Sequence, residues 1–318
     1  MSDSAIAVEL DAQYRQLRQE CGLLDRSARG KLLLTGSEVA EYLQGQLTND
    51  VEALAPGEGQ YAALLDRKGH IQADMRVLRL APDEVWIDTE AEPLEATRRH
   101  LEMYKIGREV ELADVSAERA ILSLIGPRAV EVAGSAALPE HACEEAAVEG
   151  IECIAVGTAE GIDLIAAGED AGGLRQALLG RGAAEVGEAA AEVLRIEAGR
   201  PRFGAEMSRA TMPAEAGIVE RAVDFEKGCY IGQEPVARLH YRGRPNRLLR
   251  GLELSAPATA GDALRLGEKE VGTIGSACLS PARGPIALAI VRREAEPGTE
   301  LAVGEDGVTA RVVDVPFG

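Results

Sequence analysis

The sequence contains 318 residues, of which 46% are hydrophobic and 3% aromatic, and it carries a formal net charge of −19. A chain of this length divides into about two or three domains of ~100 to 200 residues. The acidic balance argues against nonspecific nucleic-acid binding, because a phosphate backbone would be repelled. No apolar run approaches the ~20 residues of a membrane span, and the start MSDSAIAVEL lacks the features of a signal peptide, so we expect a cytoplasmic protein.

The five cysteines form no C-x-x-C pair, and their odd number argues against a disulfide framework. The four histidines are scattered singly, which argues against a histidine-built zinc site. We therefore predict no metal site.

Near the N-terminus, residues 31–35 favour a strand, and Ser37 is a candidate N-cap for the helix that follows. Residues 61–66 and 70–80 predict a hairpin joined at 67–69. In its second strand apolar and polar residues alternate, so one face is apolar and the other polar. The apolar face carries Ile71, Ala73, Met75 and Val77, and the polar face carries Gln72, Asp74 and Arg76.

Further strand and helix patterns follow, and 136–149 reads as a surface connection. Residues 185–201 predict a helix stopped by Gly199 and Pro201, and Glu197 falls on its apolar stripe. A buried acid in that position needs a partner. After Arg250 short strand patterns alternate with turns, which predicts a small all-β barrel or sandwich from about residue 246.

The segment between Arg221 and Arg250 is basic within an acidic protein, with seven Lys/Arg against three acids. It indicates a site for an anionic ligand. It contains the motif KGCYIGQE, residues 227–234, whose cysteine could be a nucleophile, a metal ligand or a thiol in a tight turn. Tyr230 and Ile231 suggest a short strand there, and the nearby positive charge favours a reactive Cys229.

Five ordered motifs together resemble the aminomethyltransferase (glycine cleavage T-protein) superfamily, and the last of them resembles its folate-binding YgfZ branch. They are LQGQLTNDV (43–51), YAALLDRKGHIQADMRV (61–77), LRIEAGRPRFGAEM (194–207), PAEAGI (213–218) and KGCYIGQEPVARLHYRGRPNRLLRGL (227–252). The resemblance implies an α+β fold: a ring of two α+β parts that bind tetrahydrofolate in a central funnel, plus a C-terminal β-barrel. It implies a folate-binding region at 1–245, with a second subdomain from about residue 115, and a barrel at 246–318.

Two departures separate the branches. After the hairpin turn, T-proteins have a segment like G-G-I-x-D-D, in which an aspartate helps activate the folate amine. In this chain the segment is GHIQAD (69–74). Ala73 therefore replaces one acid, and Asp74 remains. The T-protein signature F-I-G-R-E is here YIGQE (230–234), preceded by the Lys-Gly-Cys of the YgfZ branch. The sequence therefore favours folate binding over methylene transfer.

Each candidate residue has an ordinary structural alternative. Glu197 suits a pterin edge, which would donate two N–H bonds to its carboxylate, or an ion pair with Arg195, Arg200 or Arg202. Asp74 suits a catalytic role on a cavity wall, or a pair with Arg67 or Arg76. The other predicted folate-binding residues are Asn49, Asp50, Tyr230, Gln233, Arg238, Arg242 and Arg244, the arginines for a glutamate tail or as a solvated basic loop.

Two functions follow from the resemblance. The first is a tetrahydrofolate-binding accessory protein for iron-sulfur cluster assembly or repair, with iron-sulfur client proteins as partners and Cys229 as a functional thiol. The alternative is a folate-dependent aminomethyltransferase or demethylase acting on a small amine. A third interpretation is a domain whose folate site regulates partner binding without catalysis. The sequence leaves open whether the chain catalyses a reaction.

Overall fold

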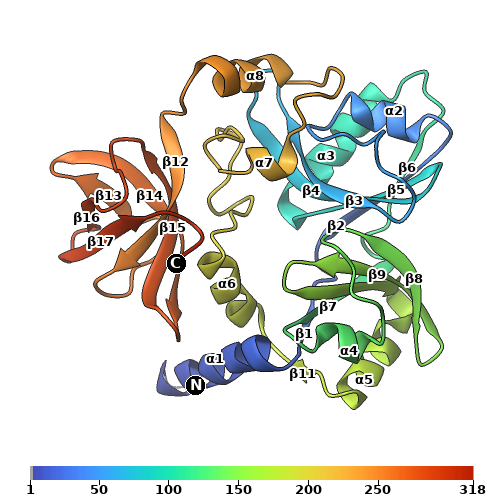
Figure 1. The fold of residues 1–318 in the computed structure, drawn as a ribbon, viewed down its shortest axis with the longest axis horizontal. Helices are drawn as coiled ribbons and strands as arrows, with labels where there is room; N and C mark the ends of the chain where they lie inside the picture. Colours follow the sequence, from blue (N-terminus) through green and yellow to red (C-terminus); the bar gives the residue numbers. More distant parts are fainter. Residues whose placement is uncertain (1–2, 318) are drawn as a thin grey trace. The chain divides into compact units, whose positions relative to one another are not determined.

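A computed structural model describes residues 3–317, which form two compact units (Figure 1). Unit 1 comprises residues up to Leu65, Gln72–Ala190 and Ala222–Ile231; unit 2 comprises Asp66–Ile71, Ala191–Arg221 and the chain from Gly232 onward. The polypeptide therefore passes between the units five times. No helix among the described residues is long and apolar enough to cross a membrane.

The first sheet of unit 1 has the strand order β3-β4-β5-β2-β6. Its strands are β2 (Gly30–Thr35), β3 (Gly59–Leu65), β4 (Ile71–Ala81), β5 (Glu84–Thr89) and β6 (Glu111–Asp114). Helices α2 (Val39–Gln44) and α3 (Ala91–Tyr104) pack on one face, where Leu43 and Leu101 join a core with Ala73, Met75 and Val77. The predicted apolar face of β4 is thus the face toward these helices.

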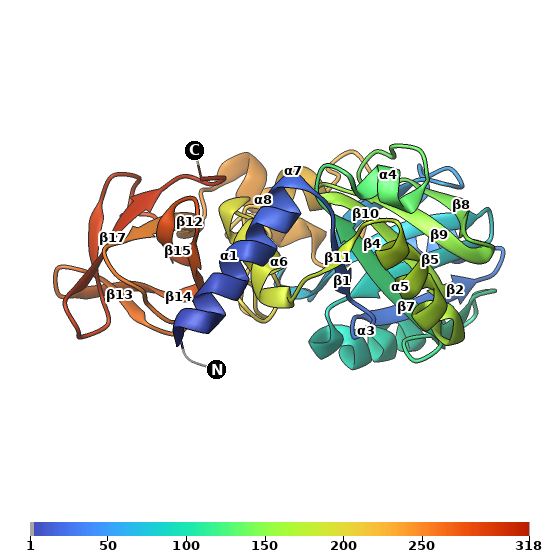
Figure 2. The same cartoon turned by 90° about the horizontal axis from the view of Figure 1, so that it is seen from below.

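The second sheet has the order β11-β1-β7-β10-β9-β8. Its strands are β1 (Gly22–Asp25), β7 (Arg119–Ile125), β8 (Cys143–Val148), β9 (Ile151–Thr158), β10 (Gly161–Ala167) and β11 (Ala184–Glu185). Helices α4 (Ala129–Ala133) and α5 (Ala171–Gly180) cover one face (Figure 2), and η1 (Gly168–Asp170) precedes α5. Helix α1 (Asp3–Gln19) leads into β1.

The two sheets of unit 1 meet through the faces that the helices leave free. Leu78 and Trp86 of the first sheet pack against Ile121, Val156 and Ile165 of the second. Because strand side chains alternate, the residues on this inner face of β4 are Asp74, Arg76 and Leu78. Part of the space between the sheets is apolar, and another part receives charged side chains.

Unit 2 contains a closed barrel with the strand order β12-β15-β14-β13-β16-β17 (Figure 1). Its strands are β12 (Arg247–Leu254), β13 (Ala263–Leu266), β14 (Lys269–Ser280), β15 (Gly284–Arg292), β16 (Glu300–Val303) and β17 (Val308–Val313). Helices α6 (Glu188–Glu197) and α7 (Val219–Ala222) each lie where the chain changes unit, and α8 (Gln233–Arg242) precedes β12. The tip of the β3–β4 hairpin also belongs to this unit: Gly69, at φ +81°, lies against Met212, Pro235 and Val236.

Three local predictions were wrong. Ser37 does not cap α2, because its hydroxyl donates to Glu109 instead and the helix begins at Val39. The predicted connection 136–149 contains strand β8, which pairs with β9 along its length. No strand starts at Tyr230; Gly232 takes φ +85° and the chain turns into α8.

Candidate functional site

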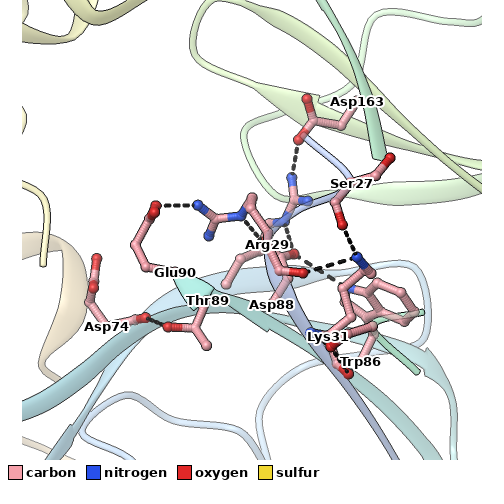
Figure 3. Close-up of polar contacts among 11 residues, drawn as sticks. Ser27, Arg29, Lys31, Asp74, Trp86, Asp88, Thr89, Glu90 and Asp163 are labelled. Atoms are coloured by element: carbon pink, nitrogen blue, oxygen red, sulfur yellow. Dashed lines mark hydrogen bonds and ion pairs between the residues drawn. The ribbon is translucent and has the colours of Figure 1, made fainter. Parts of the chain in front are cut away.

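The charged side chains between the two sheets form a buried cluster in unit 1 (Figure 3). Its centre is Asp88 on β5, whose carboxylate accepts hydrogen bonds from Arg29 Nε at 2.9 Å, Arg76 Nε at 2.7 Å and Trp86 Nε1 at 3.2 Å. Burial alone would raise the pKa of Asp88, but the charges of Arg76 and Arg29 hold it at about 2. The Asp88 carboxylate is therefore ionised at neutral pH.

Both arginines of this cluster are committed to a second carboxylate. Arg76 Nη1 donates to Asp163 Oδ2 on β10 of the other sheet at 2.7 Å. Arg29 Nη1 donates to Glu90 Oε1 at 2.5 Å. Nearby, the Lys31 ammonium donates to the carbonyls of Ser27 and Arg29 and is fully buried. Both arginines thus form their ion pairs with acids other than Asp74.

Asp74 lies at the edge of this cluster with one oxygen bonded and one free. The Tyr61 hydroxyl donates to Asp74 Oδ2 at 2.8 Å, whereas Oδ1 is buried without a hydrogen-bond partner within the described chain. Burial raises the pKa of Asp74; the Tyr61 hydrogen bond and the Arg29 charge oppose this, and Glu90 adds to it. The structure thus holds a carboxyl group that takes up a proton more readily than an ordinary aspartate.

Neither arginine predicted as a partner of Asp74 forms a hydrogen bond or ion pair with it: Arg76 bonds Asp88 and Asp163, and Arg67 lies exposed in the hairpin turn. The residues that sequence reasoning missed are Tyr61, Arg29, Asp88, Glu90 and Asp163. Tyr61 lies in the same predicted hairpin as Asp74, and strand pairing was the signal that could have found it.

The loop after α2 places Asn49 and Asp50 in unit 1. Asn49 Nδ2 donates to the carbonyl of Tyr61 at 2.9 Å, so Tyr61 connects it to Asp74. Asp50 Oδ1 accepts from Gln44 Nε2 at 2.9 Å. Asn49 is therefore close in the bonding network to Asp74, while Asp50 shapes the loop.

Lys227 fixes the KGCYIGQE segment to that loop. Its buried ammonium donates to the carbonyls of Gln44, Leu47 and Asn49 at 2.8, 2.6 and 2.9 Å. Burial lowers the pKa of Lys227 to about 8, against the attraction of Asp50. At neutral pH the amine still carries the proton that it needs to donate three bonds.

Tyr230 and Cys229, next along this segment, differ in exposure. The Tyr230 ring lies 5.1 Å from the Lys227 ammonium, and its buried hydroxyl has no partner within the described chain. Cys229 is the exposed member of the five free cysteines; Cys21, Cys143 and Cys153 are buried and Cys278 is intermediate. Burial, aided by Glu197, raises the pKa of Cys278 to about 12. Cys229 is thus the accessible thiol.

Glu197 ends helix α6 in unit 2 with its side chain buried. Ser280 Oγ, at the end of β14, donates to Glu197 Oε1 at 2.5 Å. Arg195, one of the alternative partners, bonds Glu192 and Glu206 instead.

The predicted basic loop is mostly the helix α8. Gln233 begins it, and Arg238 and Arg242 lie exposed along it, followed by the exposed Arg244. Arg247 differs, because its guanidinium holds both oxygens of Glu215 at 2.9 and 3.0 Å. The structure places Asn49, Asp50, Asp74, Cys229 and Tyr230 in unit 1, and Glu197, Gln233, Arg238, Arg242 and Arg244 in unit 2.

Across residues 3–317 there is no group of three or more His, Cys, Asp or Glu side chains that could hold a metal ion. The neighbouring acids of Figure 3 are instead held by the guanidinium groups of Arg29 and Arg76.

Comparison with known families decides the assignment. Residues 4–227 match the GCVT N-terminal domain, and residues 247–317 match the glycine cleavage T-protein C-terminal barrel domain. The chain belongs to the aminomethyltransferase (glycine cleavage T-protein) family. The α+β fold with a C-terminal barrel is thereby confirmed.

Relatives of this aminomethyltransferase-family chain match nearly its whole length. It is 31% identical to an aminomethyltransferase of Rubrobacter xylanophilus, over 97% of this chain and 86% of the relative. It is 32% identical to one of Synechococcus sp. strain RCC307, over 97% and 90%. The solved aminomethyltransferase T of the Bartonella henselae glycine cleavage system has a TM-score of 0.88 at 25% identity, over 97% of this chain and 89% of that chain. Membership in the YgfZ branch stays a prediction.

Proposed function

We propose that this chain binds a reduced folate and transfers a one-carbon unit between folate and a small amine, with Asp74 as the proton-transfer group. The observation that carries the proposal is the state of the Asp74 carboxyl: one oxygen fixed by Tyr61, the other buried and unbonded, and a raised pKa. General acid–base groups work best when their pKa lies nearer the working pH.

In the direction that loads folate, two folate nitrogens form bonds to the transferred carbon, while the bonds from that carbon to the amine nitrogen and to the sulfur of a thiol carrier break. The two N–H protons of folate leave on the released amine and thiol, so the exchange is redox-neutral. Asp74 can accept one such proton on Oδ1, because Tyr61 holds only Oδ2. Arg29 and Glu90, which act on the pKa of Asp74 in opposite directions, adjust how readily it does so.

The residue that departs from the T-protein pattern does not weaken the proposal. Ala73 faces the helices α2 and α3 and is fully buried in the apolar core with Met75. Asp74 faces the opposite side of β4. An alanine in place of an acid at 73 therefore leaves the inner face, and the carboxyl on it, unchanged.

We assign most of the remaining predicted residues to folate recognition. In unit 1, the buried hydroxyl of Tyr230 lacks a partner within the described chain and suits a polar group of a pterin edge, with Asn49 and Asp50 as further polar candidates. In unit 2, the carboxylate of Glu197 is a separate candidate for pterin recognition, with Gln233 as a further polar candidate. Of the three arginines predicted for a glutamate tail, we assign Arg244 to its carboxylates; Arg238 and Arg242 lie exposed along α8 and are left as a solvated basic surface.

The test is turnover of 5,10-methylenetetrahydrofolate with ammonium and a dithiol acceptor. The wild-type chain should release tetrahydrofolate, and Asp74→Asn should lower the rate by roughly 10²-fold or more, the usual contribution of a general acid–base group. Asp83→Asn, in the exposed turn between β4 and β5, is the matched control. Equal rates for Asp74→Asn and wild type would rule out the proposed role.

A second function, support of iron-sulfur cluster assembly or repair, is favoured by Cys229. Its thiol is the exposed one of five, on a segment that Lys227 fixes in place. Cys229→Ala should keep folate binding but fail to restore iron-sulfur enzyme activity in cells that lack the protein. Cys153→Ala, at a buried thiol, is the control. Full rescue by Cys229→Ala would count against this function, whatever the outcome of the turnover assay.

A further inference from the structure

A pocket of about 600 Å³ opens at one end of the barrel in unit 2. Its walls come from three segments: Arg244 and Pro245 before β12, Leu248 and Arg250 on β12, and 293–297 after β15. Further along β12, Leu252 and Leu254 belong to the barrel core. Since alternate residues of a strand share a face, Leu248 and Arg250 continue the core-facing row out to the barrel mouth.

The pocket gathers positive charge that the protein leaves largely unpaired. Within the described chain, Arg244 and Arg293 are exposed and form no hydrogen bond or ion pair with their guanidinium groups. Arg250 Nη1 contacts only Asp314 Oδ1, at 3.1 Å, and the Asp314 side chain is 72% exposed. Exposed pairs of this kind contribute little and exchange readily.

The acids of the pocket do not cancel this charge. Glu294 is paired with Lys269, and Glu296 lies exposed on the loop that follows. Pro245, Leu248 and Pro297 add apolar surface between the charged groups. The volume falls within the ~300 to 1,000 Å³ typical of small-molecule sites, and barrel mouths often hold them.

We infer that the barrel mouth binds an organic anion that carries two or more carboxylate groups. Guanidinium forks match carboxylates in a planar, two-bond geometry, and three of them line one pocket here. A chain of linked glutamates has this chemistry, with methylene groups for the apolar walls and a carboxylate on every unit. Inorganic phosphate carries negative charge but has no methylene groups to contact the apolar walls.

The pocket separates the arginines of the basic segment between Arg221 and Arg250 into two groups. Arg244 lines the pocket, whereas Arg238 and Arg242 lie on α8 and do not. Arg242, two residues before Arg244 and equally exposed, is therefore a control for a general effect of charge.

The experiment is calorimetric titration of the full chain with tri-γ-glutamate and, separately, with inorganic phosphate at low ionic strength. Arg244→Gln and Arg293→Gln should each weaken tri-γ-glutamate binding about tenfold, the effect of one charged hydrogen bond. Arg242→Gln should change it by less than about twofold, and Glu296→Gln should tighten it by about twofold or more, since it removes a repelling charge. Circular dichroism of each surface variant checks folding.

Three results would overturn the inference: no measurable binding of the peptide, equal losses for Arg242→Gln and Arg244→Gln, or phosphate binding as tightly as the peptide. The first two results would show that the arginines form no specific site for the peptide. The third would show that the pocket does not recognise the organic part of the ligand. The titration contains no pterin, so its failure leaves the turnover test of Asp74 unaffected.

Discussion

Arg76 on β4 and Asp163 on β10 form a 2.7 Å ion pair that joins the two sheets of unit 1, and both side chains are at least nine-tenths buried. The same guanidinium bonds Asp88. This one arginine therefore neutralises acids from both sheets.

We predict that Arg76→Met destabilises the protein by roughly 3 to 5 kcal/mol, because it leaves two buried carboxylates without their cation. Urea unfolding would measure the change. Arg99→Met, which breaks the exposed pair with Glu95, should cost less than about 1 kcal/mol. Similar losses for the two variants would show that the inter-sheet pair contributes little.

Asp74→Asn should raise the stability of the protein at neutral pH while it removes activity. Because the pKa of Asp74 lies above its ordinary value of 3.8, the native state binds this proton more tightly than the unfolded state does. Wild-type stability attributable to this group is therefore present at low pH and lost as pH rises through the raised pKa. The stability difference between Asp74→Asn and wild type should grow with pH; parallel curves would contradict the raised pKa.

Lys227→Met should destabilise the protein by roughly 3 kcal/mol, because three backbone carbonyls lose their shared donor. The same change should loosen the segment that carries Cys229, which faster hydrogen exchange of residues 228–231 would report. Lys68→Met, at an exposed turn position, provides the control and should be nearly neutral. Unchanged exchange in Lys227→Met would mean that other contacts hold the segment.

Glu197→Gln should weaken reduced-folate binding by roughly 1 to 3 kcal/mol, the range for a charged hydrogen-bond partner. Ser280→Ala removes the donor at Glu197 Oε1 but keeps the carboxylate, so it should have the smaller effect. Titration with tetrahydrofolate would measure both, with Glu188→Gln on the same helix as control. Wild-type affinity in a folded Glu197→Gln would place pterin recognition elsewhere.

Much of the fold was accessible from local sequence patterns. The alternation in 70–80 predicted β4 and both of its faces, since burial on one side of a strand repeats every second residue. The short strand patterns after residue 246 likewise became the closed barrel. Helix α8 was missed because its apolar row is short, with Val236 as its buried residue. Gly232 followed by Glu234 and Pro235 was the available signal for a helix start.

The polar cluster around Asp88 was not accessible in the same way. Its members Arg29, Arg76 and Asp163 are far apart along the chain, and only the packing of two sheets brings them together. Sequence reasoning could place Asp74 on a polar face, but it could not show which charges that face meets. The raised pKa of Asp74 depends on that arrangement.

The five crossings between units restrict how this protein can be divided by evolution or by design. A cut before the barrel would leave Asp66–Ile71 and Ala191–Arg221 without most of the unit to which they belong. A recombination event that exchanged only residues from Arg247 onward with a distant relative would therefore have to match surfaces encoded in three separate parts of the gene. We expect the two units of this protein to be inherited together. Chimaeras joined at the barrel boundary should fold only when Asp66–Ile71 and Ala191–Arg221 come from the same parent protein as the barrel.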